Sequence, residues 1–214
     1  MANIVTFETM LIDVLKDYKI YLGSQSPRRK QLLEMMDIKY EALPQLETDE
    51  NFPDNLKEYE IAEYLAQIKA QHYSSFLKNN NEIIITADTI VWINNIVLSK
   101  PKNYDEAFDM LKTLSGKMHT VFTGVCLKSL ECIHTFSDKT DVYFKKLNDD
   151  EIHYYLSNYK PYDKAGSYGA QEWIGLIAIE KINGSYFNVM GLPVNKLYVE
   201  LEKFIYNFPI KIFN

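Results

Sequence analysis

The sequence predicts an α/β fold, one unit with two closely packed lobes, and three observations support this prediction. Short apolar runs typical of strands alternate with amphipathic helical runs along the chain. The 214 residues are 47% hydrophobic and 24% charged, which is the composition of a chain that buries its own core. No internal repeat, low-complexity tract or linker divides the chain, so we expect both lobes to belong to one domain.

The first half of the chain predicts a strand, a helix and a second strand, followed by a long helix and a hairpin. The predicted elements are, in order, a strand over 19–22, a helix over 27–36, a strand over 38–43, a helix over 61–72 and a buried strand over 83–85. The buried strand is a run of three isoleucines, and we expect it to end just before Asp88. A hairpin turn is expected at Asn94 and Asn95, because asparagine tolerates a positive φ.

The second half of the chain predicts two capped helices, paired strands and a final helix. Its predicted elements are a helix over 104–114, strands over 119–128 and 133–144, a helix from 149 through 156, a strand over 173–179 and a helix after residue 193. Asn103 with Glu106 and Asn148 with Glu151 have the spacing of N-terminal capping pairs. Asn183–Gly184 is expected to turn the chain back after the predicted strand.

Residues 21–31 join an apolar run to a helix start that is rich in hydroxyl groups and cations. Ser26 has the position of an N-cap, Pro27 that of the first helical residue, and Arg28 and Arg29 fall in the first turn. Cations are unfavourable beside the positive end of a helix unless an anion is bound between them. The segment therefore predicts a polyphosphate-binding site, and the alternative is an ordinary surface helix with a Ser-Pro start.

Composition excludes several classes of function. A net charge of −6 opposes general binding to nucleic acid, so any anion site must be local. No apolar run approaches a membrane span and the N-terminus lacks a signal-peptide pattern, so we expect a cytoplasmic protein without a membrane partner. Cys126 and Cys132 are expected to be reduced thiols, and the scattered histidines argue against a zinc centre.

Three further residues are candidates for anion chemistry. Asp88 could bind a divalent cation or orient water, although a turn aspartate is an equal alternative. Lys100 leaves a rigid turn before a proline and suits a phosphate oxygen, but a solvated lysine is as good an interpretation. Lys164 lies near Gly166 and Gly169, where a ligand could approach the backbone closely, and turn glycines explain this pattern equally well.

Five motifs in order carry a family resemblance: GSQSPRRKQLL, ADTIV with KP after the hairpin, EAFDMLKTLSGKMHTVFTGV, DKAGSYGAQ, and GSYFNVMGLPV. Over residues 19–201 the chain closely resembles the Maf family of nucleoside triphosphate pyrophosphatases. The resemblance implies an inosine triphosphate pyrophosphatase-like architecture, in which a mixed twisted sheet with flanking helices forms two lobes around a central cleft. It also implies a single Maf-like domain over 19–214 after an N-terminal extension over 1–18.

The resemblance implies metal-dependent hydrolysis of a nucleoside triphosphate between its α- and β-phosphates, with Asp88 as catalytic base. The residues that it places around the phosphates are Ser24, Ser26, Arg28, Arg29, Lys69 and Lys100. A Mg²⁺ or Mn²⁺ ion would be held by Asp88 and by an acid of the segment Glu47, Asp49 or Glu50, of which Glu50 is our choice. A homodimer is expected by family analogy.

Base preference is also implied by the resemblance, because Arg28, Thr89 and Gln171 match the branch that acts on dTTP and UTP. A glutamine amide offers a donor and an acceptor that match uracil or thymine, but an amide flip would also match cytosine. Glu172 stands where many family members have glycine, and Ser99 where glycine or glutamate is frequent, so the base pocket could be reshaped.

Three alternatives stay open from the sequence. The first is the same reaction on another nucleotide, such as 7-methyl-GTP or a modified pyrimidine nucleotide. The second is a non-catalytic, nucleotide-binding regulator of septum formation, a role with which the family has been linked. The third is a plain structural domain, which requires all five motifs to be coincidental.

Overall fold

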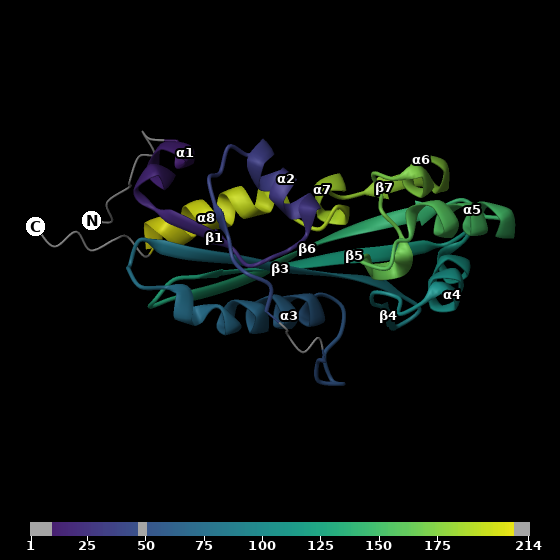
Figure 1. Cartoon of the computed structure of the whole chain (residues 1–214), viewed down its shortest axis with the longest axis horizontal. Coiled ribbons are helices and arrows are strands. Elements are labelled where there is room, and N and C mark those ends of the chain that lie inside the picture. The colour runs from purple at the N-terminus through teal and green to yellow at the C-terminus, as the bar shows by residue number, and fades with distance from the viewer. Residues whose placement is uncertain (1–9, 47–50, 208–214) are drawn as a thin grey trace, which may run out of the picture.

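A mixed β-sheet with helices on both faces forms the frame of the protein in a computed structural model that describes residues 10–46 and 51–207 (Figure 1). The strands are β1 (Lys19–Leu22), β2 (Glu41–Ala42), β3 (Glu82–Ile93), β4 (Ile96–Leu98), β5 (Met118–Lys128), β6 (Ile133–Phe144) and β7 (Ile179–Asn183). The α-helices are α1 (Leu11–Val14), α2 (Pro27–Met35), α3 (Tyr59–His72), α4 (Tyr104–Leu114), α5 (Asp149–Tyr159), α6 (Trp173–Ala178), α7 (Tyr186–Val189) and α8 (Val194–Asn207). Short 3₁₀ turns are η1 (Leu15–Asp17), η2 (Ser74–Phe76) and η3 (Ala165–Ser167).

The strand order is β2-β1-β3-β5-β6-β7, with β4 paired to the far end of β3. β1 runs parallel to both of its neighbours, and the other pairings are antiparallel, which confirms the expected mixed sheet. The three long strands β3, β5 and β6 extend along most of the molecule and give it an elongated shape (Figure 1). The division into two lobes stays a prediction.

Asp88 does not follow the end of a strand, as the sequence suggested, but lies in the middle of β3. The strand continues because its second half pairs with β5, where Asp88 faces Gly124 across the ladder. On the other side, β1 ends at Leu22, opposite Ile85. The early end of β1 therefore leaves Asp88 without a neighbouring strand on that side. The β1–α2 connection lies where such a strand would otherwise continue.

Two other expectations are corrected by the structure. The predicted strand over 38–43 is reduced to the two residues of β2. The predicted strand over 173–179 is instead helix α6, which is followed by β7. Ile174, Gly175 and Ala178 are the buried residues of α6, at helical spacing, and a short apolar run does not distinguish a buried strand from a buried helix.

The predicted turn and caps are confirmed. Asn94 and Asn95 join β3 to β4 with φ values of 52° and 62°. Asn103 accepts a hydrogen bond from the backbone N–H of Glu106 at the start of α4. Asn148 and Glu151 form a complete capping box at the start of α5. These features were predictable because each depends on residues within one turn of chain.

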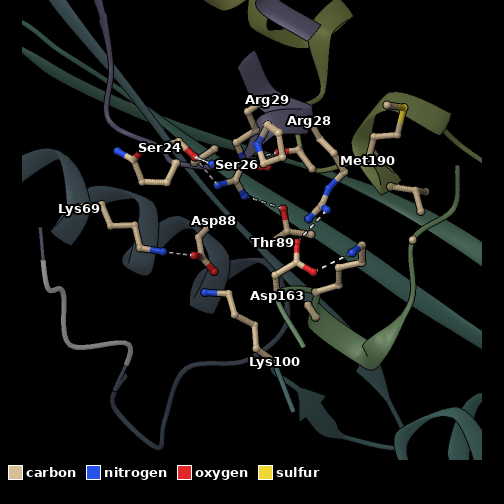
Figure 2. A pocket seen from close by; sticks show the side chains of 18 of the residues that line it. Ser24, Ser26, Arg28, Arg29, Lys69, Asp88, Thr89, Lys100, Asp163 and Met190 are labelled. Carbon is tan, nitrogen blue, oxygen red and sulfur yellow. Dashed lines mark hydrogen bonds and ion pairs between the residues drawn. The ribbon is translucent and has the colours of Figure 1, made fainter. Parts of the chain in front are cut away.

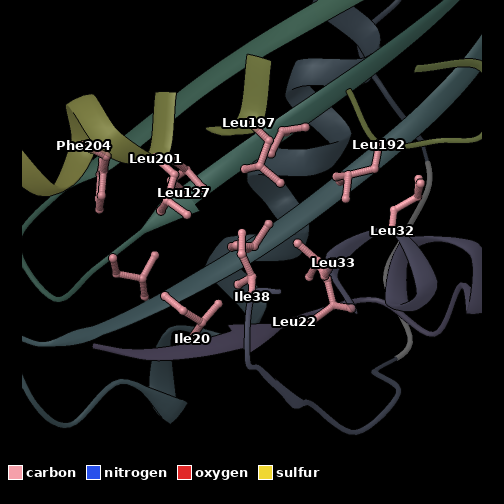
Figure 3. Packing of buried hydrophobic residues seen from close by; sticks show 14 of the residues in the cluster. Ile20, Leu22, Leu32, Leu33, Ile38, Leu127, Leu192, Leu197, Leu201 and Phe204 are labelled. Atoms are coloured by element: carbon pink, nitrogen blue, oxygen red, sulfur yellow. The ribbon is translucent and has the colours of Figure 1, made fainter. Parts of the chain in front are cut away.

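The two largest clusters of buried residues lie toward opposite ends of the long strands. In the first cluster, α2 and α8 pack on one face of β1, β3 and β5, through residues such as Leu33, Leu127 and Leu201 (Figure 3). Leu11 and Leu15, which precede residue 19, belong to this cluster. The second cluster joins the far ends of β3 and β5 to α4, α5 and α6. Both clusters receive side chains from β3, so this strand connects them.

Helix α3 covers the face of the sheet that is opposite α2 and α8 (Figure 1). A Cβ atom on Gly124 of β5 would lie 2.3 Å from the carbonyl carbon of Ala62, so glycine permits this close approach. Thr86 Oγ1 donates a hydrogen bond of 2.7 Å to the Ala66 carbonyl. These contacts fix α3 against β3 and β5. None of the helices within the described residues is long and apolar enough to cross a membrane.

Candidate active site

A cavity of about 410 Å³ opens where the β1–α2 connection passes β3. Every predicted site residue in the described part of the chain lines this cavity, and Figure 2 labels most of them. These residues are Ser24, Ser26, Arg28, Arg29, Lys69, Asp88, Thr89, Lys100, Lys164 and Gln171. Glu50, together with its alternatives Glu47 and Asp49, lies outside the described residues. Gln45 and Leu46, which precede that acidic segment, also line the cavity.

The first wall of the cavity is the connection from β1 to α2. Gly23 begins it, and a Cβ atom there would lie 2.7 Å from the ring of Tyr73 and 2.8 Å from Thr86 Cγ2. Ser26 precedes the helix as predicted, but its side chain makes no capping hydrogen bond. Instead, Ser24 Oγ accepts a bond of 3.3 Å from the Ser26 N–H. The prediction that Ser26 has the N-cap position is therefore confirmed, although its own hydroxyl makes no hydrogen bond to the first turn of α2.

Arg29 is held by three hydrogen bonds. Its Nε donates to the Gly191 carbonyl at 2.8 Å, and its two terminal nitrogens donate to Ser24 Oγ and Thr89 Oγ1, both at 3.1 Å. Gly191 has a φ of 105°, a conformation that glycine adopts without strain. The guanidinium group is thus fixed between α2, β3 and the loop after α7, and a ligand would meet it already oriented.

Asp88 and Lys69 form an ion pair at the centre of the cavity (Figure 2). The Asp88 side chain is 11% exposed and that of Lys69 14% exposed, so water screens the pair only in part. Lys69 comes from the last turn of α3, and its place depends on the packing of that helix on the sheet. Figure 2 shows the amino group of Lys100 pointing toward Asp88 from below.

The opposite wall carries a chain of alternating charges. Arg28 donates to Asp163 Oδ2 at 3.2 Å, and Lys164 donates to Asp163 Oδ1 at 2.7 Å. Lys164 also forms an ion pair of 3.0 Å with Glu172 Oε1. Partial burial alone would raise the pKa of Asp163, but the hydrogen bond from Lys164 and the charges of Lys164 and Arg28 lower this pKa below its usual value.

Several residues that sequence reasoning missed connect the site to the core. Thr89 Oγ1 lies 3.0 Å from Thr123 Oγ1, which donates to the Asn188 carbonyl at 3.0 Å. Asp163 was missed as a site residue, although its position beside Lys164 in the DKAG motif was a signal. Thr123 and Asn188 also lie within quoted motifs, but their contact with Thr89 could not be read from the sequence, because they are far from it in the chain and meet it only through the fold.

Comparisons with known proteins place this architecture in a family. The model of the family described as Maf-like protein matches residues 19–204. A protein of Phocaeicola vulgatus named dTTP/UTP pyrophosphatase is 53% identical over 193 residues, which are 90% of this chain and 100% of the relative. Proteins with the same name from Parabacteroides distasonis and Flavobacterium johnsoniae are 50% and 47% identical, over 91% and 92% of this chain and the whole of each relative. The chain therefore belongs to the Maf-like protein family.

Proposed function

We propose that this protein is a nucleoside triphosphate pyrophosphatase that hydrolyses dTTP and UTP to the monophosphate and pyrophosphate. The observation that carries the proposal is a single cavity that is lined by three cations, Arg29, Lys69 and Lys100, together with the carboxylate of Asp88. The names of the relatives, which align along nearly their whole length, support the same substrates. A pyrophosphatase needs such a combination, because cations must bind the phosphates where a carboxylate can act on water.

The phosphate chain would bind at the β1–α2 wall. A nucleoside triphosphate carries about four negative charges, which repel an attacking water unless cations spread them. Arg29 is already oriented by its three hydrogen bonds, so little reorganisation is needed when the phosphates arrive. The hydroxyl groups of Ser24 and Ser26 and the backbone amides before α2 add neutral donors at the same wall. Together they would fix the α-phosphorus relative to Asp88.

Asp88 is the proposed general base. Its carboxylate lies in the cavity and accepts a hydrogen bond from Lys69, which sets the direction of the carboxylate oxygens. A water between Asp88 and the α-phosphate would transfer a proton to the carboxylate as it attacks. The leaving pyrophosphate would gain its charge beside Lys69 and Lys100.

We propose that Mg²⁺ or Mn²⁺ assists this reaction. No group of three or more potential ligands gathers within residues 10–46 and 51–207, so a closed metal cage is not formed there. Asp88 nevertheless supplies a hard oxygen ligand, and Mg²⁺ commonly binds one or two carboxylates together with substrate phosphates. Glu50 is proposed as the second carboxylate, supported by the position of Gln45 and Leu46 in the cavity wall. Such an ion would neutralise phosphate charge and activate water.

Gln171 and Arg28 are proposed to contact the base at the wall opposite α3, since both line the cavity. Their donors match the carbonyl oxygens of thymine and uracil. The expected cytoplasmic location and homodimer stay predictions; the free thiols of Cys126 and Cys132 support a reducing compartment.

The test is pyrophosphate release from dTTP, UTP, CTP and 7-methyl-GTP, measured with Mn²⁺ and with Mg²⁺. We expect the highest kcat/KM for dTTP and UTP. Asp88→Asn should abolish release while nucleotide affinity stays within about tenfold, or ~1.4 kcal/mol, because the base is lost and the phosphate contacts remain. Affinity is measured by isothermal titration calorimetry.

Asp141→Asn is a matched control, because Asp141 is a hydrogen-bonded strand aspartate that does not line the cavity. This variant should keep the wild-type rate. Full turnover by Asp88→Asn would refute the assigned base, and absence of pyrophosphate release from every nucleotide by the wild type would refute the function.

A further inference from the structure

Glu172 lies just behind the cavity wall and links two segments of the chain that border the cavity. Its Oε1 atom is 3.0 Å from Lys164 Nζ, and its Oε2 atom accepts a hydrogen bond from the Tyr155 hydroxyl. The same hydroxyl accepts a bond of 3.1 Å from the Gly169 N–H. The carboxylate therefore ties the segment 163–164 to the segment 169–172, which contains Gln171.

The path of this side chain depends on glycine. A Cβ atom on Gly169 would lie 2.7 Å from Glu172 Cδ and 2.9 Å from Oε2. The carboxyl group thus passes directly over the Gly169 backbone to reach Lys164. Its side chain is 20% exposed and that of Lys164 is 9% exposed, so the ion pair is largely shielded from water. An ion pair in such surroundings holds its geometry better than one on the surface.

The charges of this wall are balanced. Two cations, Arg28 and Lys164, alternate with two carboxylates, Asp163 and Glu172, in one continuous chain of contacts. A wall without net charge offers little to a polyphosphate, whereas it suits an uncharged base that needs directed hydrogen bonds. Without Glu172 the wall would carry one excess positive charge.

We infer that Glu172 is a positioning residue for base selection: through Lys164 and Asp163 it fixes the guanidinium of Arg28, and through Tyr155 and Gly169 it fixes the backbone beside Gln171. The inference rests on the proposed function, because it concerns how the same cavity chooses its base. Glu172 itself does not line the cavity and acts on the ligand only through its neighbours.

The consequence for selectivity follows from hydrogen-bond chemistry. A guanidinium has only N–H donors and no acceptor, so a fixed Arg28 can face only acceptor atoms of a base. Thymine and uracil present a carbonyl oxygen where cytosine presents an amino group. A rigid Arg28 therefore disfavours cytosine, because its guanidinium N–H and the cytosine amino group are both donors and would face each other. A mobile Arg28 can turn away from the amino group, so cytosine is tolerated.

The experiment compares wild type with Glu172→Gln for binding of dTTP and CTP by calorimetry in EDTA, and for kcat/KM with Mn²⁺. Glutamine keeps the shape but loses the charge that holds Lys164. We expect the preference for dTTP over CTP to fall about tenfold, or ~1.4 kcal/mol, in both measurements. The kcat for dTTP should stay within about threefold, because the phosphate wall and Asp88 are unchanged.

Glu200→Gln is the matched control. Glu200 is a partly buried glutamate of α8 that pairs with Lys203 and His134, and it does not line the cavity. This variant should retain the wild-type preference. Thermal melting of each variant verifies folding.

Tyr155→Phe is a second test variant, because it removes only the hydroxyl that donates a hydrogen bond to Glu172. It should lower the preference by about threefold.

A double mutant separates positioning from general loosening. Because Glu172 acts on Arg28 through Asp163 and on the backbone beside Gln171 through Tyr155, Glu172→Gln combined with Asp163→Asn should lower the preference by less than the sum of the two single losses. Additive losses would contradict the proposed path. An unchanged preference in folded Glu172→Gln would overturn the inference and leave the pyrophosphatase activity intact. Failure of the wild type to bind either nucleotide, together with absence of pyrophosphate release with Mn²⁺, would overturn both the inference and the proposed function.

Discussion

His119 of β5 is an imidazole buried to 1% exposure in the second core cluster region. Its Nε2 atom lies 2.8 Å from the hydroxyl of Tyr168, and its ring packs edge-on against Tyr168 and Phe144. Burial lowers the pKa of His119 to about 3, and this effect outweighs the opposing charge of Asp141. The residue is therefore neutral in the folded protein near neutral pH.

This histidine predicts acid sensitivity of the fold. Between pH 6.5 and about 3, the unfolded chain binds a proton at this residue and the folded protein does not. The contribution of His119 to the free energy of unfolding is therefore fully present above the pKa of this residue in the unfolded chain. It is lost as the pH falls below that pKa, by up to about 1.4 kcal/mol per pH unit. Urea unfolding of wild type and His119→Gln at pH 7, 6 and 5 measures this change in the free energy of unfolding.

The difference between the two proteins isolates the histidine from the carboxylates that titrate in both. His119→Gln should be less stable than wild type at pH 7 and should lose less stability on acidification. Parallel curves for the two proteins would show that His119 is not held neutral by burial.

Helix α3 positions Lys69, which pairs with Asp88 in the cavity, and the contact between this helix and the sheet is unusually close. Gly124 of β5 lies against the backbone of Ala62 and Glu63, where any side chain atom would come within 2.5 Å. Lys69 lies further along the same helix and pairs with Asp88 on β3. The position of the Lys69 amino group is thus set by how closely the helix approaches the sheet.

Gly124→Ala should move α3 away from the sheet and separate Lys69 from Asp88. We expect a loss of about 1–3 kcal/mol in stability, typical of overpacking, together with a fall in kcat. Thermal melting and pyrophosphate release measure the two effects. Backbone atoms are the obstacle, so rotation of a side chain cannot relieve the clash.

Gly116→Ala is the control for this change. Gly116 has a φ of 70°, and the nearest atom to an added Cβ is 3.7 Å away, so alanine there strains the backbone without displacing α3. This variant should melt lower but keep the wild-type turnover per folded molecule. Equal losses of turnover in both variants would contradict the role assigned to the α3 contact.

Both large core clusters share the same long strands, and this continuity decides how the molecule should unfold. In β3, Ile85 belongs to the first cluster and Val91 to the second; in β5, Val125 and Val121 are divided in the same way. A hydrogen-bonded ladder joins these positions without interruption. The elongated shape therefore does not by itself imply two independently folded units.

Native-state hydrogen exchange tests this property of the whole chain. The amides of β3 and β5 in the two clusters should exchange through one global opening, with free energies that agree within about 1 kcal/mol. Two groups of amides separated by more than about 2 kcal/mol would instead show that each end opens alone. Such a result would support the division into two lobes, which the sequence suggested.

The sequence predicted those parts of the site that depend on neighbouring residues. Pro27 begins α2 as expected from its own position, whereas Arg29, Asp88 and Lys100, which reach one cavity from distant segments, were identified together by the family resemblance. Elements with ambiguous periods were less predictable: the apolar run after Glu172 formed a helix because its buried positions face the second cluster. The place of Asp88 within β3 depended on the pairing of the second half of this strand with β5, which the pattern of isoleucines did not indicate.

By itself, the sequence determined the hairpin at Asn94, the caps of α4 and α5, and the chemistry gathered before α2, since φ preferences and capping bonds act within a few residues. Only the tertiary structure decided that Arg28 meets Asp163 and that Glu172 reaches Lys164. Contacts between segments distant in the chain depend on how sheets and helices pack, and packing is a property of the whole fold that no local pattern encodes.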